Sequence, residues 1–249
     1  MQAAILSAGL GTRISPHFNG LYKPMVPVAG MPMIEFQLRS IEYAGIDKVA
    51  ILLRREYKSV GDYIVSLGLR VRLDVFFEDT CGGAYSLFAL SDVLRRESDF
   101  FLFSVDSIFA PNSLKEFVTS RAGKTTPEIV TWVTHKSDQD TNYVGVVMSD
   151  KRVVDFGKHI QHCDYIAEGP FHCQISVLNR DLVREAGRKG IVGLSNYFSY
   201  LLSSGITLGG YMVDTVFDVD TPADAKRANS FLAGAVDTLR QANRHTELS

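Results

Sequence analysis

The sequence predicts an α/β fold in which a parallel sheet is covered by helices. Along the first 110 residues, short apolar runs that suit buried strands alternate with longer segments of helical periodicity. Turns that contain glycine or proline separate these segments. Regular alternation of strand and helix at this spacing is typical of parallel sheets with helices on their faces.

The composition supports one globular domain. The 249 residues are 46% hydrophobic and 22% charged, which is enough for one well-filled core, and we expect a single domain over residues 1–249. The net charge of −2 argues against a nucleic-acid partner. No apolar segment approaches the length of a membrane span and no basic leader precedes the first apolar run, so no membrane partner is expected. Three scattered cysteines suggest neither disulfides nor a zinc pair, and they favour a reducing, cytoplasmic location.

The individual elements follow from local signals in order along the chain. Apolar runs predict strands at residues 3–7, 49–53, 71–77, 100–106, 128–134, 143–148 and 170–178. Helical spacing predicts helices at residues 32–45, 57–68, 84–94, 113–120, 179–186, 196–202 and 223–239. The first of these helices begins at Pro32 and ends at Gly45, and Asn179 is expected to cap a later one.

A loop with little side-chain bulk follows the first strand. The segment Ser7-Ala8-Gly9-Leu10-Gly11 lets backbone N–H groups approach an anion closely, and Arg13 and Lys23 add two positive charges. This pattern predicts a site for a nucleoside triphosphate or its diphosphate product. The loop lacks the Gly-Lys-Ser/Thr ending of a Walker loop and the third glycine of a dinucleotide-binding loop. A tight turn with an incidental arginine is the structural alternative.

Aspartates at two places in the chain are candidates for a metal site. Asp106 ends an apolar strand, where packing needs no carboxylate but a hard divalent cation that bridges phosphates needs oxygen ligands. Near the C-terminus, Asp218 and Asp220 flank one apolar residue, so both carboxylates point to the same side of an extended segment. Thr221 is expected to cap the helix that follows, which explains the Thr-Pro pair but not the aspartates.

One specific signature, G-x-G-T-R followed at variable spacing by K-P, is matched residue by residue. The matching residues are Gly9, Gly11, Thr12, Arg13, Lys23 and Pro24. In this respect the sequence resembles the nucleotidyltransferases that make nucleotide sugars and related activated alcohols. The resemblance extends over nearly the whole chain and implies a three-layer α/β/α sandwich with a mixed, mostly parallel Rossmann-like sheet, of the nucleotide-diphospho-sugar transferase type.

The resemblance also implies roles for individual residues. Arg13 and Lys23 would be catalytic, holding the triphosphate and offsetting charge on the departing pyrophosphate, with Lys23 on an exposed loop that has little packing role. The nucleoside triphosphate would contact the ends of the first and third strands, at Leu6, Ala8, Gly9, Gly11, Thr12, Gly82 and Gly83. For Gly82 and Gly83, an ordinary strand-to-helix turn is the alternative. The acceptor would contact Gly145 and Lys158.

The same resemblance divides the chain into functional parts. Residues 1–110 would bind the nucleoside triphosphate, residues 111–215 the acceptor, and residues 216–240 would supply a second metal ligand and a C-terminal helix. The metal would be Mg²⁺, held by Asp106 together with Asp218 or Asp220, because carboxylates and phosphate oxygens suit it.

The middle of the chain departs from the family pattern. Gly157 stands where many sugar-nucleotide members have a glutamate that holds a sugar hydroxyl, and His159 replaces a proline. Lys158 keeps the lysine that contacts the acceptor phosphate, although a solvated surface lysine is the alternative. A group of potential zinc ligands fits no structural zinc pattern and is expected in loops and at strand edges: His159, His162, Cys163 and His172.

The predicted reaction is attack by an acceptor phosphate oxygen on the α-phosphorus of a nucleoside triphosphate, which releases pyrophosphate. An ionised phosphate needs no general base, so positioning and charge neutralisation suffice. The expected acceptor is a sugar 1-phosphate, and the alternative is CTP-dependent transfer to phosphocholine, an inositol phosphate or a phosphonate. A non-catalytic, nucleotide-sensing regulator on the same fold is a further alternative, against which the retention of Arg13, Lys23, Asp106 and Asp218 argues. Whether the chain forms a homo-oligomer is left open.

Overall fold

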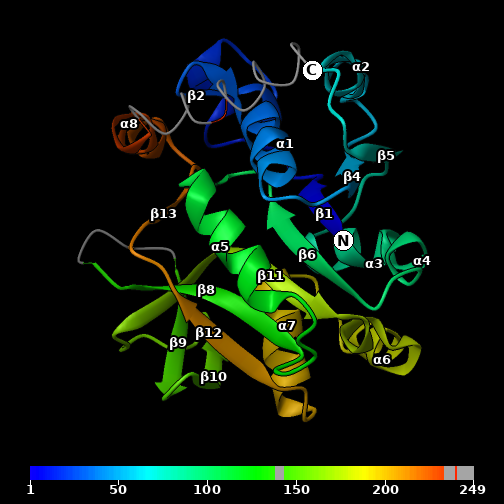
Figure 1. Ribbon diagram of the computed structural model, residues 1–249, viewed down its shortest axis with the longest axis vertical. Coiled ribbons are helices and arrows are strands. Elements are labelled where there is room, and N and C mark those ends of the chain that lie inside the picture. The colour runs from blue at the N-terminus through cyan, green and yellow to red at the C-terminus, as the bar shows by residue number, and fades with distance from the viewer. Residues whose placement is uncertain (138–142, 233–238, 240–249) are drawn as a thin grey trace.

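A nine-stranded sheet runs through the centre of the computed structural model, which describes residues 1–137, 143–232 and 239 (Figure 1). The strand order is β5-β4-β1-β6-β11-β8-β12-β10-β9. The strands are β1 (Gln2–Ser7), β4 (Lys48–Leu53), β5 (Arg72–Phe77), β6 (Asp99–Ser104), β8 (Ile129–His135), β9 (Val144–Ser149), β10 (Arg152–Gly157), β11 (Tyr165–Gln174) and β12 (Leu208–Met212). Two small ribbons accompany it, formed by β2 (Pro27–Val28) with β3 (Met31–Pro32) and by β7 (Ser107–Phe109) with β13 (Val216–Asp218).

The sheet is mixed, and most of its strands run in one direction. β1 pairs in parallel with both β4 and β6, and β4 pairs in parallel with β5. β11 and β10 run the opposite way, so each is antiparallel to its neighbours. β9 also pairs with β11, so the strands at this end of the sheet curl back on themselves. The predicted three-layer sandwich with a mostly parallel sheet is thus confirmed.

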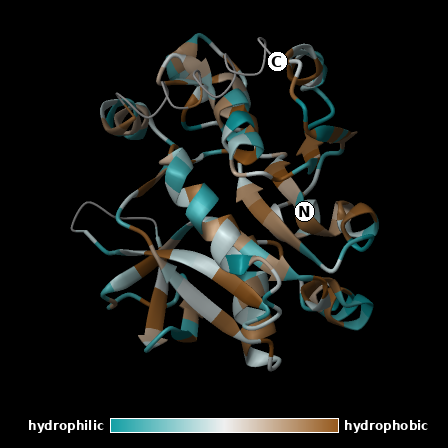
Figure 2. Ribbon diagram, in the orientation of Figure 1, coloured by the Kyte–Doolittle hydropathy of each residue, from teal (hydrophilic) through white to brown (hydrophobic). Residues whose placement is uncertain are grey.

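Helices cover both faces of the sheet. They are α1 (Met33–Tyr43), α2 (Lys58–Ser66), α3 (Gly83–Ala89), α4 (Ser91–Leu94), α5 (Pro111–Arg121), α6 (Arg180–Arg188), α7 (Leu194–Ser203) and α8 (Pro222–Phe231). Figure 1 shows α1 and α5 in front of the sheet, and Figure 2 shows hydrophilic residues on their outer faces and hydrophobic residues along the central strands.

The alternation of side chains along β1 explains the two layers of core. Ala3 and Ile5 point into a cluster that contains residues of α1, α2 and α5, whereas Ala4 and Leu6 point into a second cluster with residues of α3, α4, α6 and α7. A strand that is buried on both faces must be apolar at every position, and residues 3–6 of β1 are all apolar. A third cluster joins α1 to α8, and so fixes the C-terminal helix against the N-terminal third of the chain.

Several boundaries differ from those predicted. β11 begins at Tyr165, earlier than expected, and a 3₁₀ helix over Ile175–Leu178 replaces its expected end. Pro32 precedes α1 and does not occupy its first turn. The caps are confirmed, since the Asn179 side chain accepts hydrogen bonds at the start of α6 and Thr221 does so at the start of α8. The predicted continuation of α8 to residue 239 falls largely outside the described residues. None of the described helices is long and apolar enough to cross a bilayer.

Candidate active site

The candidate site lies at the carboxyl ends of β1 and β6. After β6 ends at Ser104, the chain turns through Asp106 and enters β7, which pairs with β13 so that Ser107 lies opposite Asp218. The N–H of Val219 donates to the carbonyl of Asp106 at 2.9 Å. Backbone pairing therefore brings together two aspartates that are more than 100 residues apart in the sequence.

Three carboxylates meet at this point. Asp106, Asp218 and Asp220 each offer one oxygen, and these oxygens lie within 4.8 Å of one another. This arrangement confirms that Asp218 and Asp220 point to the same side. The backbone at Asp220 is held by the capping box of α8, in which the Asp224 carboxylate accepts from the Thr221 N–H at 2.8 Å.

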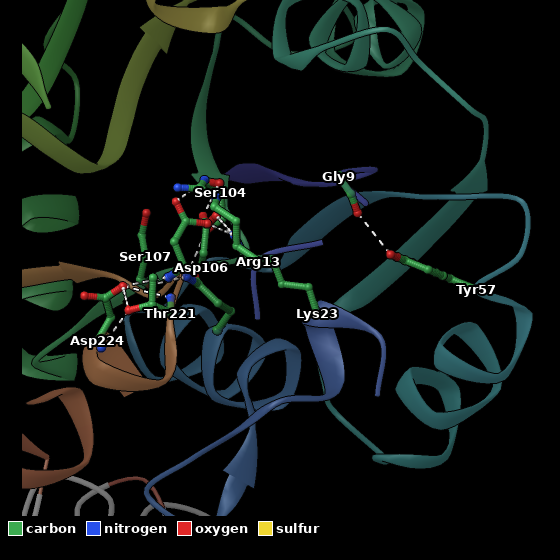
Figure 3. Close-up of polar contacts among 11 residues, drawn as sticks. Gly9, Arg13, Lys23, Tyr57, Ser104, Asp106, Ser107, Thr221 and Asp224 are labelled. Atoms are coloured by element: carbon green, nitrogen blue, oxygen red, sulfur yellow. Dashed lines mark hydrogen bonds and ion pairs between the residues drawn. The ribbon is translucent and has the colours of Figure 1, made fainter. Parts of the chain in front are cut away.

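Lys23 lies among these carboxylates (Figure 3). Its ammonium group forms ion pairs with Asp106 and, at 2.6 Å, with the Oδ1 of Asp220. The expectation that Lys23 is exposed is wrong, because only 7% of the residue is accessible to solvent. Lys23 begins a short 3₁₀ helix, Lys23–Met25. The next residue, Val26, is buried in the cluster that joins α1 and α8. This packing of Val26 holds Lys23 beside the carboxylates.

The charges of the cluster shift one another's protonation. Burial lowers the pKa of Lys23, but attraction to Asp106 and Asp220 outweighs burial and raises it above the ordinary lysine value. Burial raises the pKa of Asp106, whereas the Lys23 ammonium lowers it, and the net shift is downward. Repulsion from Asp106 raises the pKa of Asp218 well above its usual range, although Asp218 is exposed to solvent. A further cation at this point would relieve the repulsion between Asp106 and Asp218.

The predicted phosphate loop follows β1 and is open to solvent. Arg13 on this loop pairs with the Oδ2 of Asp220 at 2.5 Å, so the loop and the carboxylate cluster form one site. Within the described chain, none of the backbone N–H groups of residues 9–13 donates a hydrogen bond. The buried hydroxyls of Ser7 and Ser15, at the two ends of the loop, also have no described partner. Unused donors of this kind are what a phosphate ligand requires.

The glycines of the predicted nucleotide site have packing roles that the structure explains. Gly11 has φ +64°, and a Cβ there would lie 2.6 Å from the Cβ of Lys23. A Cβ on Gly82 would lie 2.7 Å from the carbonyl oxygen of Val192, which supports the alternative of a close strand-to-helix turn. Gly9 instead faces open space, and its carbonyl accepts from the Tyr57 hydroxyl at 3.0 Å (Figure 3). Leu6 and Ala8, at the end of β1, are both buried.

Two cavities open beside the carboxylates. The first, of about 450 Å³, extends from Asp106 and Asp218 to Lys158 and is also lined by residues of β11 and the start of α7. The second, of about 370 Å³, is lined by Arg13, Asp220 and residues around β13. Lys158 thus faces the same cavity as the carboxylates. Gly145 does not line it, and a Cβ at Gly145 would lie 2.8 Å from the Ile160 carbonyl oxygen, so packing alone accounts for this glycine.

Comparison with known proteins identifies the family. The family model for nucleotidyl transferases matches residues 2–178, which is more than half of the chain. The chain belongs to the nucleotidyl transferase family. Residues 2–178 include the phosphate loop, Lys23, Asp106 and Lys158, whereas the Asp218–Asp220 segment lies beyond the match.

The names of individual relatives of this chain differ in the substrates that they give. The chain is 26% identical over 235 residues to a bifunctional IPC transferase and DIPP synthase from Rubrobacter xylanophilus, covering 93% of this chain and 52% of the relative. A D-glycero-α-D-manno-heptose 1-phosphate guanylyltransferase from Campylobacter jejuni is 31% identical over 77 residues, covering 30% of this chain and 35% of the relative. The chain thus spans about half the length of the first relative.

A solved structure supports the fold. The inositol-1-phosphate CTP transferase from T. maritima superposes with a TM-score of 0.75 at 20% sequence identity, covering 94% of this chain and 96% of that one. At this identity the likeness establishes the shared fold alone. The fold expected from the sequence is therefore confirmed independently of the site residues.

Two residues that position the site were not found by sequence reasoning. Gln37, on α1, is fully buried, and its side-chain amide donates to the carbonyls of Ser104, at 3.1 Å, and Ser107. It therefore spans the turn that carries Asp106. The Ser104 hydroxyl donates to the Asp106 carboxylate. Both residues lie in ordinary apolar segments, so only the long-range contacts reveal them.

His172 is the clearest correction to the sequence analysis. It lies in β11 between β6 and β8 and is fully buried, not in a loop or at an edge. Its Nε2 lies 2.9 Å from Asp99, and its Nδ1 accepts from the Arg121 Nε at 3.2 Å. The metal-ligand cluster found among the described residues is the aspartate group, and the zinc interpretation of the histidines gains no support.

Proposed function

We propose that this chain transfers a nucleoside monophosphate from a nucleoside triphosphate to a phosphorylated small molecule, with release of pyrophosphate. The observation that carries the proposal is the joining of an open, donor-rich loop to a carboxylate cluster by Arg13 and Lys23. A cavity with its own lysine, Lys158, opens from the same carboxylates. Two sites for phosphate groups thus flank one cluster that favours a cation.

In this proposal each residue acts through charge and position. The N–H groups of Gly9, Gly11 and Thr12 bind triphosphate oxygens, and Leu6, Ala8, Gly82 and Gly83 shape the rest of the nucleotide site. Arg13 and Lys23 stabilise the negative charge that moves to the pyrophosphate when the bond between the α-phosphorus and the bridging oxygen breaks. Lys158 holds the acceptor phosphate, whose ionised oxygen attacks without a general base, and Gly145 has only a packing role.

The three aspartates fit a divalent cation. Their oxygens come from two segments that are distant in the sequence yet lie within 4.8 Å of one another, and hard oxygen ligands are what Mg²⁺ prefers. Asp106 with Asp218, Asp220 or both would hold it. When bound, the ion would neutralise charge on the phosphates. Asp106 and Asp220 are already gathered by Lys23, so the protein itself assembles much of the ligand set.

Two classes of acceptor are compatible with this site. A sugar 1-phosphate is the first candidate, and the name of the heptose 1-phosphate guanylyltransferase relative is consistent with it. The second candidate is an inositol phosphate used with CTP, and the name of the inositol-1-phosphate CTP transferase from T. maritima, which shares the fold, is consistent with it. We further propose that the reaction takes place in the cytoplasm, where the three free cysteines would stay reduced.

The decisive experiment measures pyrophosphate release. The purified chain is incubated with Mg²⁺ and each of the four common nucleoside triphosphates, together with glucose 1-phosphate, inositol 1-phosphate, phosphocholine or a phosphonate. Turnover that needs both substrates would support the proposal and identify base and acceptor. Tight triphosphate binding without turnover in any combination would favour the nucleotide-sensing alternative.

A further inference from the structure

A bulge in β11 points to the residue that selects the acceptor. Ala167 pairs with Val133 of β8, but the next paired residue, Phe171, pairs with Thr131, so β11 carries additional residues at this point. Pairing with β9 ends at Ala167, and pairing with β6 begins at Phe171. Residues 168–170 therefore lie at the junction where β11 changes partners. Bulges near active sites commonly redirect one side chain.

The bulge is held rigidly. Gly169 has φ +83°, and a Cβ there would lie 3.2 Å from Val216 and 3.3 Å from the ring of Trp132, which is fully buried. A larger residue would strain this backbone and collide with the core. The neighbouring Glu168 is therefore carried by backbone that cannot easily shift.

Glu168 lies at the boundary between the two cavities of the site. It lines the 450 Å³ cavity with Lys158 and also the 370 Å³ cavity with Asp220. Its negative charge contributes to raising the pKa of Asp218, although less than Asp106 does, so the two carboxylates are near each other. A carboxylate at this place lines the same cavity as two of the proposed cation ligands, Asp106 and Asp218, and Lys158.

We propose that Glu168 binds hydroxyl groups of a phosphorylated polyol and thereby selects this acceptor class. The inference rests on the proposed function. Gly157, which precedes Lys158, has no side chain that could bind a hydroxyl group. The Glu168 carboxylate can accept hydrogen bonds from two adjacent hydroxyls. Ser195 and Asn196, from the start of α7, line the same cavity and offer further partners for hydroxyl groups.

The cavity fits a polyol better than an alkylammonium acceptor. Cations of that kind are typically held by open aromatic faces. Here Phe156 is only 1% exposed, and Phe171 packs against Phe198 with ring centroids 4.7 Å apart. Phe156 thus belongs to the core and Phe171 is partly buried. The third ring at the cavity wall, that of Tyr143, already has the Lys136 ammonium 5.1 Å from its centroid. The hydroxyl and amide groups of Ser195 and Asn196 also line this cavity.

The test compares Glu168→Ala and Glu168→Gln with the parent protein and with Asp164→Ala, an exposed carboxylate just before β11. Pyrophosphate release is measured with inositol 1-phosphate, glucose 1-phosphate, a deoxy analogue of each, and phosphocholine. Glu168→Ala should raise the acceptor KM by about 10- to 100-fold, as expected for lost hydrogen bonds to a charged group, and the penalty should shrink with the deoxy analogues. Glu168→Gln should recover most of the loss, because its amide oxygen still accepts from a hydroxyl.

Other outcomes have distinct meanings. The KM for the nucleoside triphosphate should stay within about threefold of the parent, because the lost hydrogen bonds belong to the acceptor. An equal rise in this KM, or an unchanged acceptor KM in Glu168→Ala, would overturn the assignment while the proposed function stood. A preference for phosphocholine, with Glu168→Gln as damaging as Glu168→Ala, would identify a cation-binding carboxylate instead. No turnover by the parent with any acceptor would overturn the proposed function and this assignment with it.

Discussion

Lys23 links the charge balance of the site to the stability of the fold. Its ammonium group neutralises part of the charge on Asp106 and Asp220, and all three side chains are shielded from most of the solvent. A catalytic lysine on a mobile loop would have little effect on folding, but a buried ion pair leaves an unpaired charge when one partner is removed. Lys23 is therefore expected to affect both turnover and stability.

We predict that Lys23→Met lowers kcat/KM by about 100-fold or more, because charge on the leaving pyrophosphate loses a stabilising partner. In the absence of divalent cations, the free energy of unfolding should fall by about 1–3 kcal/mol. Pyrophosphate release and urea unfolding measure the two effects, with the exposed Lys58→Met as control. Near-normal kcat/KM would refute the catalytic role, and an unchanged free energy of unfolding would refute the buried ion pair.

The aspartates are predicted to act as one unit. If Asp106 shares an ion with Asp218 or Asp220, each single Asn substitution at a true ligand should lower kcat by about 100-fold, and the double variant should lose less than about tenfold more. Steady-state kinetics at several Mg²⁺ concentrations give these values. Multiplicative losses would show that the aspartates act independently. If Asp218→Asn or Asp220→Asn keeps normal activity and an unchanged Mg²⁺ requirement, the residue replaced in that variant is not a ligand of the ion.

At the scale of elements, two connections hold the site and the sheet in place. The capping box of Thr221 and Asp224 fixes the start of α8 beside Asp220. The contact of Arg121 and Asp99 with His172 ties the end of α5 to β6 and β11. The capping box is local but directly follows Asp220, whereas the second connection joins three segments that are distant in the sequence. The loss of either should therefore have effects beyond one side chain.

Thr221→Ala should destabilise the protein by about 0.5–2 kcal/mol, the usual loss when an N-cap is removed. Because Asp220 directly precedes the cap, the variant should also need more Mg²⁺ for half-maximal activity. Thermal unfolding and a Mg²⁺ titration test these effects against Ser230→Ala, which removes a hydroxyl from the exposed side of the same helix. Equal behaviour of the two variants would contradict the role of the cap in positioning Asp220.

His172 should make stability depend on pH. Burial lowers the pKa of His172 from 6.5, and although Asp99 opposes this, the net shift is downward, so the folded protein keeps the ring neutral. As pH falls through 6.5, the unfolded chain gains a proton that the folded chain does not, and stability is lost until pH passes the lowered folded value. Urea unfolding at pH 7.5, 6.5 and 5.5 should show a steeper loss for the parent than for His172→Gln, which cannot titrate. Parallel pH profiles would contradict the shift.

At the scale of the whole molecule, the sequence predicted the parallel half of the sheet better than the rest. β1, β4 and β6 are apolar on both faces, so their runs are unmistakable. β10 and β12 were missed, because Arg152 and Asp155 interrupt the apolar run in β10 and β12 contains Gly209 and Gly210. The phosphate loop and the aspartates were recognisable by motif. Gln37 and Glu168 were not, since their positions follow from helix packing and from a bulge.

The final prediction concerns metal removal and the whole fold. The core is built from apolar clusters on both faces of the sheet, and the carboxylates already have Lys23 as a counter-charge, so the folded state does not need an ion. EDTA should therefore abolish turnover, and added Mg²⁺ should restore it. The Tm should change by less than about 4 °C, which corresponds to at most about 1–2 kcal/mol for a chain of this size. Differential scanning calorimetry, with and without EDTA, gives the comparison. A fall of tens of degrees would show that a metal holds the fold together, in which case the aspartate cluster would be a structural site and the proposed role of the ion in catalysis would have to be abandoned.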